Sequence, residues 1–183
     1  PTTHVLTGVM NSNLRQMAEA EALRRGVPLR DIRAREVGTR LREGATVDPA
    51  RVELVRRDHL ASGGEEVFLS MEDPEADAVI GFLRLRRVGP DPFRPEFQDP
   101  AGAAVIRELK VYGAAQTLGT HDDPETGAWQ HQGHGARLLA EAEPIAQKWG
   151  VGRLLVIAGA GVKPYYRKHG FADLGPYVAK SVP

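Results

Sequence analysis

The sequence lacks cysteine, any net charge and any long apolar run. Without cysteine this chain cannot by itself form a disulfide framework or a thiolate site for zinc or an iron–sulfur cluster. Its 24 basic and 24 acidic residues cancel, so composition does not indicate a nucleic-acid binder. No apolar run reaches the roughly 18 residues of a membrane span, and "PTTHVLTGVMNSNLRQ" is not a secretory signal. We expect a cytoplasmic protein without a membrane anchor or metal site.

What is present is typical of a soluble domain. The 183 residues are 42% hydrophobic and 26% charged, which suffices for a buried core. We expect one domain over residues 49–183, with residues 1–48 as a linker segment. The chain starts at Pro1 rather than Met, so we expect a piece of a longer protein.

The charge is unevenly distributed, with an arginine-rich strip at residues 24–42. This strip, "RRGVPLRDIRAREVGTRLR", carries seven arginines against Asp31 and Glu36. Such a run is either a solvated face or a phosphate-binding surface, and the pattern leaves both open.

Local patterns predict an α/β fold. Residues 13–25 have strong helix formers between Asn13, a potential cap, and Gly26, a potential stop. After Pro49, the turn signals "ASGGEE" and "EDPEAD" separate three antiparallel strands. A fourth strand follows at 104–112. Strict alternation along it puts Val105, Arg107, Leu109 and Val111 on one face, and Ile106, Glu108, Lys110 and Tyr112 on the other.

The stretch "QHQGHGARLL" at 130–139 predicts a glycine turn that opens a helix. Leu138, Ala142, Ile145 and Trp149 form the apolar stripe of that helix. A buried strand in "GRLLVIAGAG", a short helix "KPYYRKH" and terminal strands in "FADLGPYVAKSV" complete the chain.

A strand, a glycine turn and a helix N-terminus together form an anion site, since the first helical amides lack internal partners. Gly133 and Gly135 would let those amides approach a pyrophosphate closely. A tight turn without a ligand is the alternative. The dinucleotide pattern G-x-G-x-x-G is not met, because position 138 is Leu.

Q-x-x-G-x-G at 130–135 resembles the pyrophosphate loop of the GNAT acetyltransferases, and "PYYRKHGF" at 164–171 is similar to their Φ-Y-x-x-x-G-F pattern. The resemblance implies a central mixed, mostly antiparallel sheet with flanking helices and a splayed acetyl-CoA cleft. It aligns Tyr166 with the family tyrosine that can protonate the leaving thiolate, while Tyr165 would pack or close the pocket.

Longer strings, among them "IRAREVG", "GFLRLRR", "IRELKVYG", "EAEPIA" and "LGPYV", resemble the acetyltransferase region of the Elongator catalytic subunit family, over almost the whole chain. This resemblance implies acetyl-CoA as cofactor and the tRNA wobble uridine as target. It makes residues 1–48 the link from a radical-SAM domain of the parent enzyme. Further expected partners are other Elongator-like subunits or a second copy of the chain. The connection at 116–129 corresponds to a loop that can lie over the acetyl-CoA site.

The resemblance implies three groups of site residues. The catalytic candidates are Tyr166, Tyr165 and Glu108. The acetyl-CoA candidates are Leu109, Val111, Gln130, His131, Gln132, Gly133, His134, Gly135, Gly159, Tyr165 and Tyr166. The tRNA candidates are Arg33, Arg35, Arg56 and Arg57. Two other functions stay open: a stand-alone GNAT that acetylates an amine, with Glu108 or His134 as base, and a non-catalytic RNA-binding module.

Overall fold

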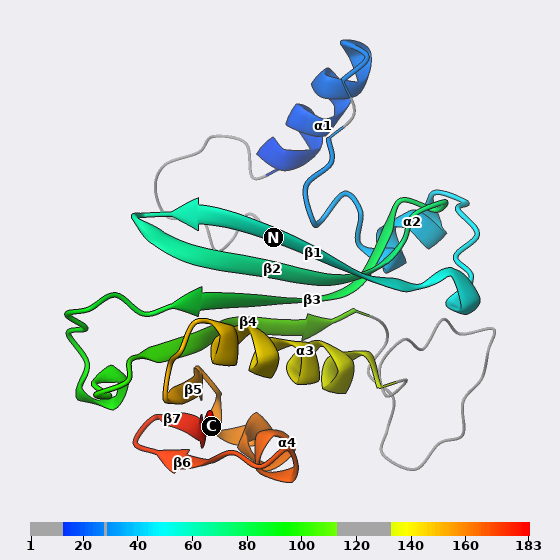
Figure 1. The fold of residues 1–183 in the computed structure, drawn as a ribbon. Coiled ribbons are helices and arrows are strands. Elements are labelled where there is room, and N and C mark those ends of the chain that lie inside the picture. The colour runs from blue at the N-terminus through cyan, green and yellow to red at the C-terminus, as the bar shows by residue number, and fades with distance from the viewer. Residues whose placement is uncertain (1–12, 28, 113–132) are drawn as a thin grey trace.

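The computed structural model describes residues 13–27, 29–112 and 133–183, and shows a single open sheet flanked by helices (Figure 1). Seven strands lie in the order β1-β2-β3-β4-β5-β7-β6. The strands are β1 (Glu53–Ala61), β2 (Gly64–Asp73), β3 (Ala78–Arg87), β4 (Ala103–Val111), β5 (Arg153–Val156), β6 (Ala172–Leu174) and β7 (Tyr177–Ser181). The helices are α1 (Leu14–Arg24), α2 (Val37–Arg42), α3 (His134–Lys148) and α4 (Lys163–Lys168), with single 3-10 turns at Pro49–Arg51, Pro95–Phe97 and Ala160–Val162.

The first four strands form an antiparallel meander, as the turn signals predicted. The β1–β2 turn uses positive φ angles at Ser62 and Gly63, and the β2–β3 turn uses one at Asp77. Glycine and short polar residues adopt such angles readily, so the chain can reverse direction within a few residues at both turns.

The β4–β5 pair is the point where the sheet opens. These strands are parallel and pair only over Ala103–Ile106 and Arg153–Val156. Beyond Ile106, β4 continues to Val111 while β5 ends, so the two chains separate into a V-shaped splay. The predicted α/β class, with a mixed and mostly antiparallel sheet, is confirmed.

A β-bulge in β4 corrects the predicted alternation of its side chains. Neighbouring residues Arg84 and Leu85 of β3 pair with Glu108 and Ile106, which leaves Arg107 as an extra residue. An extra residue shifts every later side chain to the opposite face. Ile106 therefore shares the α3 side with Leu109 instead of opposing it. Alternation cannot reveal a bulge, since it assumes one residue on each strand per step.

The main core lies between the sheet and α3, which packs on β2, β3 and β4. Leu138, Leu139, Ala142, Ile145 and Ala146 of α3 are buried there, in agreement with the predicted stripe except for Trp149, which follows the helix and is half-buried. A second cluster on the other face joins Ala103, Val105 and Leu155 with the C-terminal hairpin.

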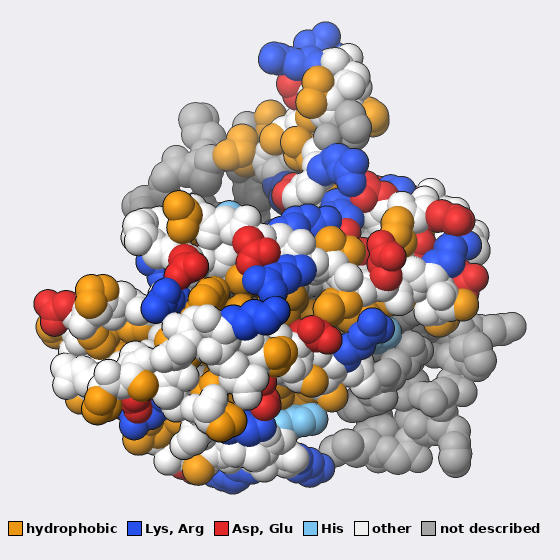
Figure 2. Space-filling model, in the orientation of Figure 1, with side chains coloured by type: hydrophobic (Ala, Val, Ile, Leu, Met, Phe, Trp, Pro, Cys, Tyr) orange, Lys and Arg blue, Asp and Glu red, His pale blue; other side chains and the backbone are white. Residues whose placement is uncertain are grey.

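The N-terminal helix α1 confirms the predicted helix within one residue at each end. It buries none of its residues and stands away from the sheet (Figure 1), and basic side chains gather at its far end (Figure 2). The chain then returns to the sheet, where Glu36 bridges to Val79 just before α2.

Candidate functional site

The β4–β5 splay holds a cleft of about 580 Å³. Its walls come from the end of β4, the start of α3 and helix α4. The lining residues are Leu109, Val111, Gly133, Gly135, Ala136, Val162, Tyr165 and Tyr166. Six of the sequence-predicted catalytic or acetyl-CoA residues therefore meet here, although they come from three separate parts of the chain.

One lip of the cleft is the N-terminus of α3. Gly133, its cap residue, has a left-handed backbone with φ of +81°. The first bond of the helix runs from the Arg137 amide to the Gly133 carbonyl at 2.9 Å, so the amides of residues 134–136 have no partner within the helix ladder. The helix dipole and the direction of these N–H groups, which point out of the ladder, make this lip suited to an anion.

Gly135 also limits the width of the cleft. A Cβ at this position would lie 2.9 Å from the Tyr165 hydroxyl oxygen and 3.5 Å from Cγ2 of Val111. Only hydrogen fits in that space without displacing the tyrosine. The two glycines of the motif are therefore required for different reasons. Gly135 is required by lack of space, whereas a Cβ on Gly133 would meet nothing within 4 Å, so Gly133 is required by its backbone angle.

The other lip carries two adjacent tyrosines of α4. Their rings meet edge to face at 5.3 Å between centroids. Tyr166 is only 6% exposed, whereas Tyr165 is 37% exposed. Burial, with a smaller effect of Tyr165, raises the pKa of Tyr166 to about 12. Burial also raises the pKa of Tyr165. Both phenols are therefore protonated and able to donate hydrogen bonds near neutral pH.

His134 is the first residue of α3 and is half-buried. Burial and the nearby Arg137 lower the pKa of His134, so its imidazole is neutral at pH 7. Gly159 lies on the exposed segment just before the 3-10 turn that leads into α4. The predicted ligands Gln130, His131 and Gln132, and the 116–129 connection, fall outside the described residues.

Glu108, the third catalytic candidate, is not brought together with the tyrosines. It lies on the opposite face of β4 from Leu109 and Val111, where its carboxylate is 3.9 Å from the Arg84 guanidinium. The strand itself separates Glu108 from the cleft.

The four arginines predicted to bind tRNA have different environments. Arg35 is bound at 2.5 Å to Glu72 and at 2.7 Å to Asp77, and Arg57 is bound at 2.6 Å to Glu72. These two arginines neutralise a buried carboxylate. Arg56 is paired with Asp58 at 2.6 Å. Arg33 is exposed, and no ion pair engages its guanidinium within the described part of the chain.

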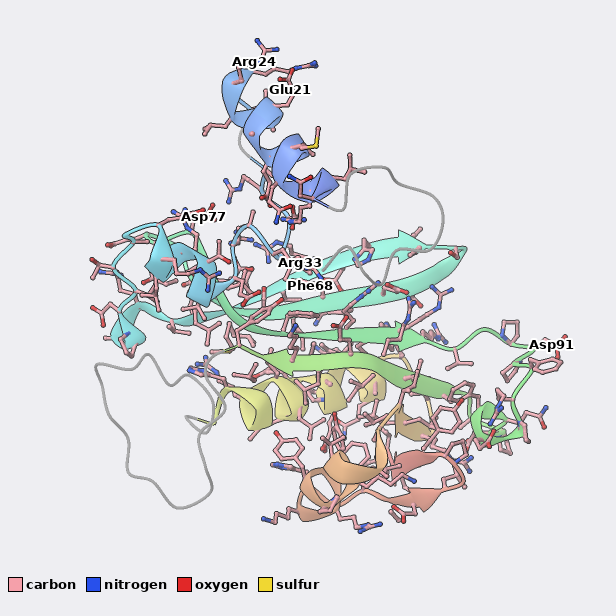
Figure 3. All side chains as sticks on the ribbon, turned by 180° about the vertical axis from the view of Figure 1, so that it is seen from behind. Glu21, Arg24, Arg33, Phe68, Asp77 and Asp91 are labelled. Atoms are coloured by element: carbon pink, nitrogen blue, oxygen red, sulfur yellow. The ribbon has the colours of Figure 1, made fainter. Side chains whose placement is uncertain are left out.

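Arg33 borders a second cavity, of about 630 Å³, on the sheet face opposite α3. Figure 3 shows this face, with Arg33 beside Phe68. Phe68 stacks on Phe82 at 5.4 Å, and Lys110 lies 4.7 Å from the ring centroid of Tyr112. Sequence reasoning missed this cluster. The only signal for it was spacing, since Lys110 and Tyr112 are two residues apart on one strand.

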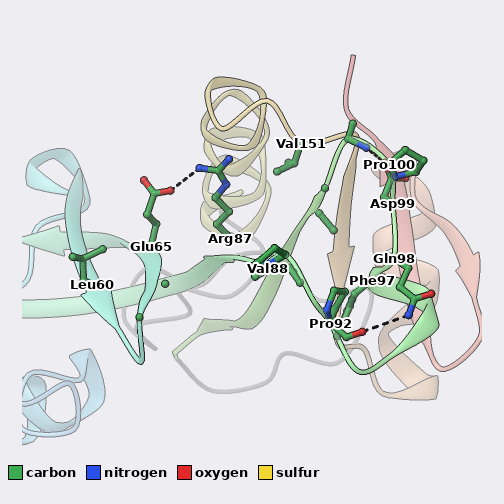
Figure 4. A pocket seen from close by; sticks show the side chains of 17 residues that line it. Leu60, Glu65, Arg87, Val88, Pro92, Phe97, Gln98, Asp99, Pro100 and Val151 are labelled. Carbon is green, nitrogen blue, oxygen red and sulfur yellow. Dashed lines mark hydrogen bonds and ion pairs between the residues drawn. The ribbon is translucent and has the colours of Figure 1, made fainter.

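A larger cavity than the cleft lies elsewhere. It measures about 810 Å³ and is bordered by parts of the β3–β4 connection, the β1–β2 turn and Val151 (Figure 4). This cavity is at the start of β4, whereas the splay is at its end. None of the predicted site residues lines it.

No three His, Asp or Glu side chains among the described residues gather in a way that could hold a metal ion. No helix in the described ranges has the length and apolar character needed to cross a membrane.

Comparison with known proteins identifies relatives that match the whole chain, although no family model matches the sequence. Elongator complex protein 3 of Danio rerio is 45% identical over all 183 residues, and that of Homo sapiens is 44% identical over 181 residues, or 98% of the chain. A solved structure of archaeal Methanocaldococcus infernus Elp3 with an N-terminal deletion superposes with a TM-score of 0.81 at 40% identity, covering 99% of this chain and 42% of that one.

The chain is homologous to part of Elongator complex protein 3. It spans about one third of the length of those curated relatives, 32% in both cases. The predicted resemblance to the Elongator catalytic subunit family is thereby confirmed over the whole sequence.

Proposed function

We propose that this chain is the acetyl-CoA-binding acyltransferase domain of an Elongator-type enzyme that modifies the tRNA wobble uridine. The observation that carries the proposal is the cleft at the β4–β5 splay. It combines an anion-binding helix N-terminus, an apolar wall and a protonated, buried phenol within one space.

The cleft fits the parts of acetyl-CoA. The amides at the start of α3 suit the pyrophosphate, because they lie at the positive end of the helix dipole and Gly133 places no side chain beside them. Leu109, Val111 and Val162 offer apolar contact for the pantetheine arm. Val162 is 51% exposed, so a bound pantetheine arm would cover apolar surface.

Tyr166 is the proposed proton donor. When water attacks the acetyl carbonyl, the C–S bond breaks and the departing sulfur gains negative charge. A phenol with a pKa of about 12 is protonated at neutral pH and can donate a hydrogen bond to the sulfur as negative charge develops on it. As the Tyr166 proton passes to sulfur, a proton of the attacking water replaces it on the phenol oxygen, so that acetic acid and the CoA thiol form and Tyr166 ends unchanged.

In the proposed parent enzyme, this domain would supply the acetyl group to a uridine carbon activated in a radical-SAM domain. This chain has no cysteine with which to hold a cluster. Its own share is binding acetyl-CoA, releasing CoA in response to tRNA, and holding part of the tRNA.

The face opposite α3 is the proposed tRNA contact. Arg33 and Lys110 both border its cavity and have no ion pair within the described ranges. Phosphates attract such uncompensated cations, and bases can stack on aromatic side chains. Lys110 and Val111 are neighbours on β4 that line opposite faces of the sheet, so RNA on this face would be separated from the cleft by the thickness of the sheet. Arg35 and Arg57 are both ion-paired with Glu72, so they would support this face rather than contact RNA directly.

The test of the chemistry is Tyr166→Phe, assayed for CoA release with tRNA present. We expect turnover to fall by roughly 10²–10⁴, the range for a lost general acid, with acetyl-CoA affinity unchanged. Tyr177→Phe is the matched control, because Tyr177, the first residue of β7, packs on Phe97 and does not line the cleft. Wild-type turnover in the Tyr166 variant, or loss of binding instead of turnover, would contradict the assignment.

The test of the RNA contact is charge reversal at Arg33 and Lys110. Each reversal should weaken tRNA binding and reduce the slope of log affinity against log salt by about 0.7–0.9 per lost phosphate contact. Lys148→Glu, an exposed reversal on α3, is the control. Equal slopes in all three proteins would remove this face from the proposal.

A further inference from the structure

Helices α3 and α4 form the two lips of the cleft, and few contacts between described residues join them. One contact is steric, where Gly135 of α3 meets the Tyr165 hydroxyl. The second is polar and passes through a residue of neither helix. Lys180 of β7 extends its ammonium group to both helices at once.

Lys180 makes three contacts from one half-buried position. Its Nζ donates to Glu143 Oε1 of α3 at 2.6 Å and to the His169 carbonyl oxygen at 3.3 Å. The same nitrogen lies 6.0 Å from the centroid of Phe171. His169 caps the C-terminus of α4, where a cation also interacts favourably with the helix dipole.

The end of α4 held by Lys180 is directly connected to Tyr166. The amides of His169 and Phe171 both donate to the Tyr166 carbonyl, at 2.9 and 3.2 Å. The Phe171 ring also packs edge to face against the Tyr166 ring, with centroids 5.9 Å apart. A shift of this turn would therefore move the Tyr166 backbone and ring together.

We propose that Lys180 is a positioning residue, which holds the C-terminal turn of α4 against α3 through Glu143 and so fixes the Tyr166 phenol in the cleft. The inference rests on the proposed function, because it assigns Lys180 an effect on turnover through Tyr166. Helix α4 has only six residues and cannot hold its own orientation by length. A neutral or shorter side chain at position 180 would leave the turn joined to Tyr166 but no longer joined to α3.

The experiment compares Lys180→Met, Lys180→Arg and Glu143→Gln with the wild-type 183-residue chain. We expect Lys180→Met to lower kcat for CoA release about 10- to 100-fold, as an ångström-scale misplacement does, while KM for acetyl-CoA changes less than about two-fold. Lys180→Arg should restore turnover, because a guanidinium can donate to a carboxylate and a carbonyl together. The kcat of Glu143→Gln should lie between those of Lys180→Met and Lys180→Arg. The double variant of Lys180→Met and Glu143→Gln should lose little more kcat than Lys180→Met alone.

Lys168→Met is the matched control. It removes a lysine from the same end of α4, where the side chain is exposed and makes no ion pair in the described ranges, so its kcat should equal that of the wild type. A second readout is independent of activity. In Lys180→Met, hydrogen exchange should accelerate at the amides of residues 169–171, while the buried part of α3 keeps its protection.

The outcomes separate the two proposals. No CoA release by the wild type would remove the proposed function, and the exchange measurement would still decide whether Lys180 holds the turn. Wild-type kcat in Lys180→Met, or unchanged exchange at residues 169–171, would overturn the positioning role. Equal losses of kcat in the Met and Arg variants would also overturn it, because the conservative variant retains the contacts.

Discussion

Acid should weaken the attachment of the arginine-rich strip to the sheet, through Glu72. This carboxylate is buried, and burial would by itself raise its pKa. Hydrogen bonds from Arg57, Ser70 and Arg35 outweigh burial and lower the pKa to about 2, from an ordinary 4.5. Arg35 belongs to the strip, so the charge of Glu72 links residues 24–42 to β2.

The lowered pKa of Glu72 fixes the direction in which the free energy of unfolding changes with pH. The folded state binds a proton at Glu72 less readily than the unfolded state, so this contribution is complete above pH 4.5 and is lost as the pH falls toward 2. The difference between 4.5 and about 2 corresponds to about 3 kcal/mol of unfolding free energy, of which about 2 kcal/mol is lost by pH 3. Asp73 has a pKa lowered to about 2 as well, so the effect of Glu72 must be isolated by mutation.

The assay is urea unfolding of the wild type and Glu72→Gln at pH 7 and pH 3. At pH 7 the variant should be less stable by about 3–5 kcal/mol, because Arg35 and Arg57 lose their counter-charge. The gap should shrink by about 2 kcal/mol at pH 3. At pH 7.5, trypsin should cut Glu72→Gln faster within the strip. Glu75→Gln, a neighbouring exposed carboxylate, is the control. The same gap at both pH values would refute this account of Glu72.

Three further results are expected. Gly133→Ala should lower stability by about 1–2 kcal/mol in urea unfolding, because φ there is +81°; unchanged stability would mean that the backbone relaxes. Gly135→Ala should keep or raise stability through better helix propensity, yet weaken acetyl-CoA binding in calorimetry, because the methyl group displaces Tyr165; unweakened binding would show that the cleft tolerates it. Turnover should not decline between pH 7 and 10 through ionisation of Tyr166, whose pKa is about 12; an inflection in that range that disappears in Tyr166→Phe would contradict the pKa.

Local signals predicted the order of elements well. The turn residues near Gly63 and Asp77 act through their own backbone angles, so their effect is visible in the sequence. The stripe from Leu138 to Ala146 is likewise a local repeat, and it fixed which side of α3 packs on the sheet. The buried strand predicted at 152–161 was too long, because β5 ends at Val156 and Ile157 is exposed at the splay.

Long-range features could not be predicted in this way. The bulge at Arg107 depends on how β4 pairs with β3, and a single strand carries no record of its partner's register. The pairing of Arg35 and Arg57 with Glu72 joins residues 37 and 15 positions apart. In the sequence alone, both arginines look as available as Arg33. The motif residues at the cleft were predicted because a family resemblance carries three-dimensional information that composition does not.

The extra residue in β4 makes the parity of the strand a functional property. With Arg107 present, Leu109 and Val111 turn to the cleft, while Lys110 turns to the cavity on the other face. Deleting Arg107 would let Glu108 follow Ile106 directly and would leave Leu109, Lys110 and Val111 on their present faces, because Arg84 and Leu85 already pair with Glu108 and Ile106. Deleting Leu109 instead would shift the residues after it to the opposite face, so that Lys110 entered the apolar cleft. The bulge thus compensates for one extra residue in β4, and loss of Arg107 should be tolerated far better than loss of a residue that follows it.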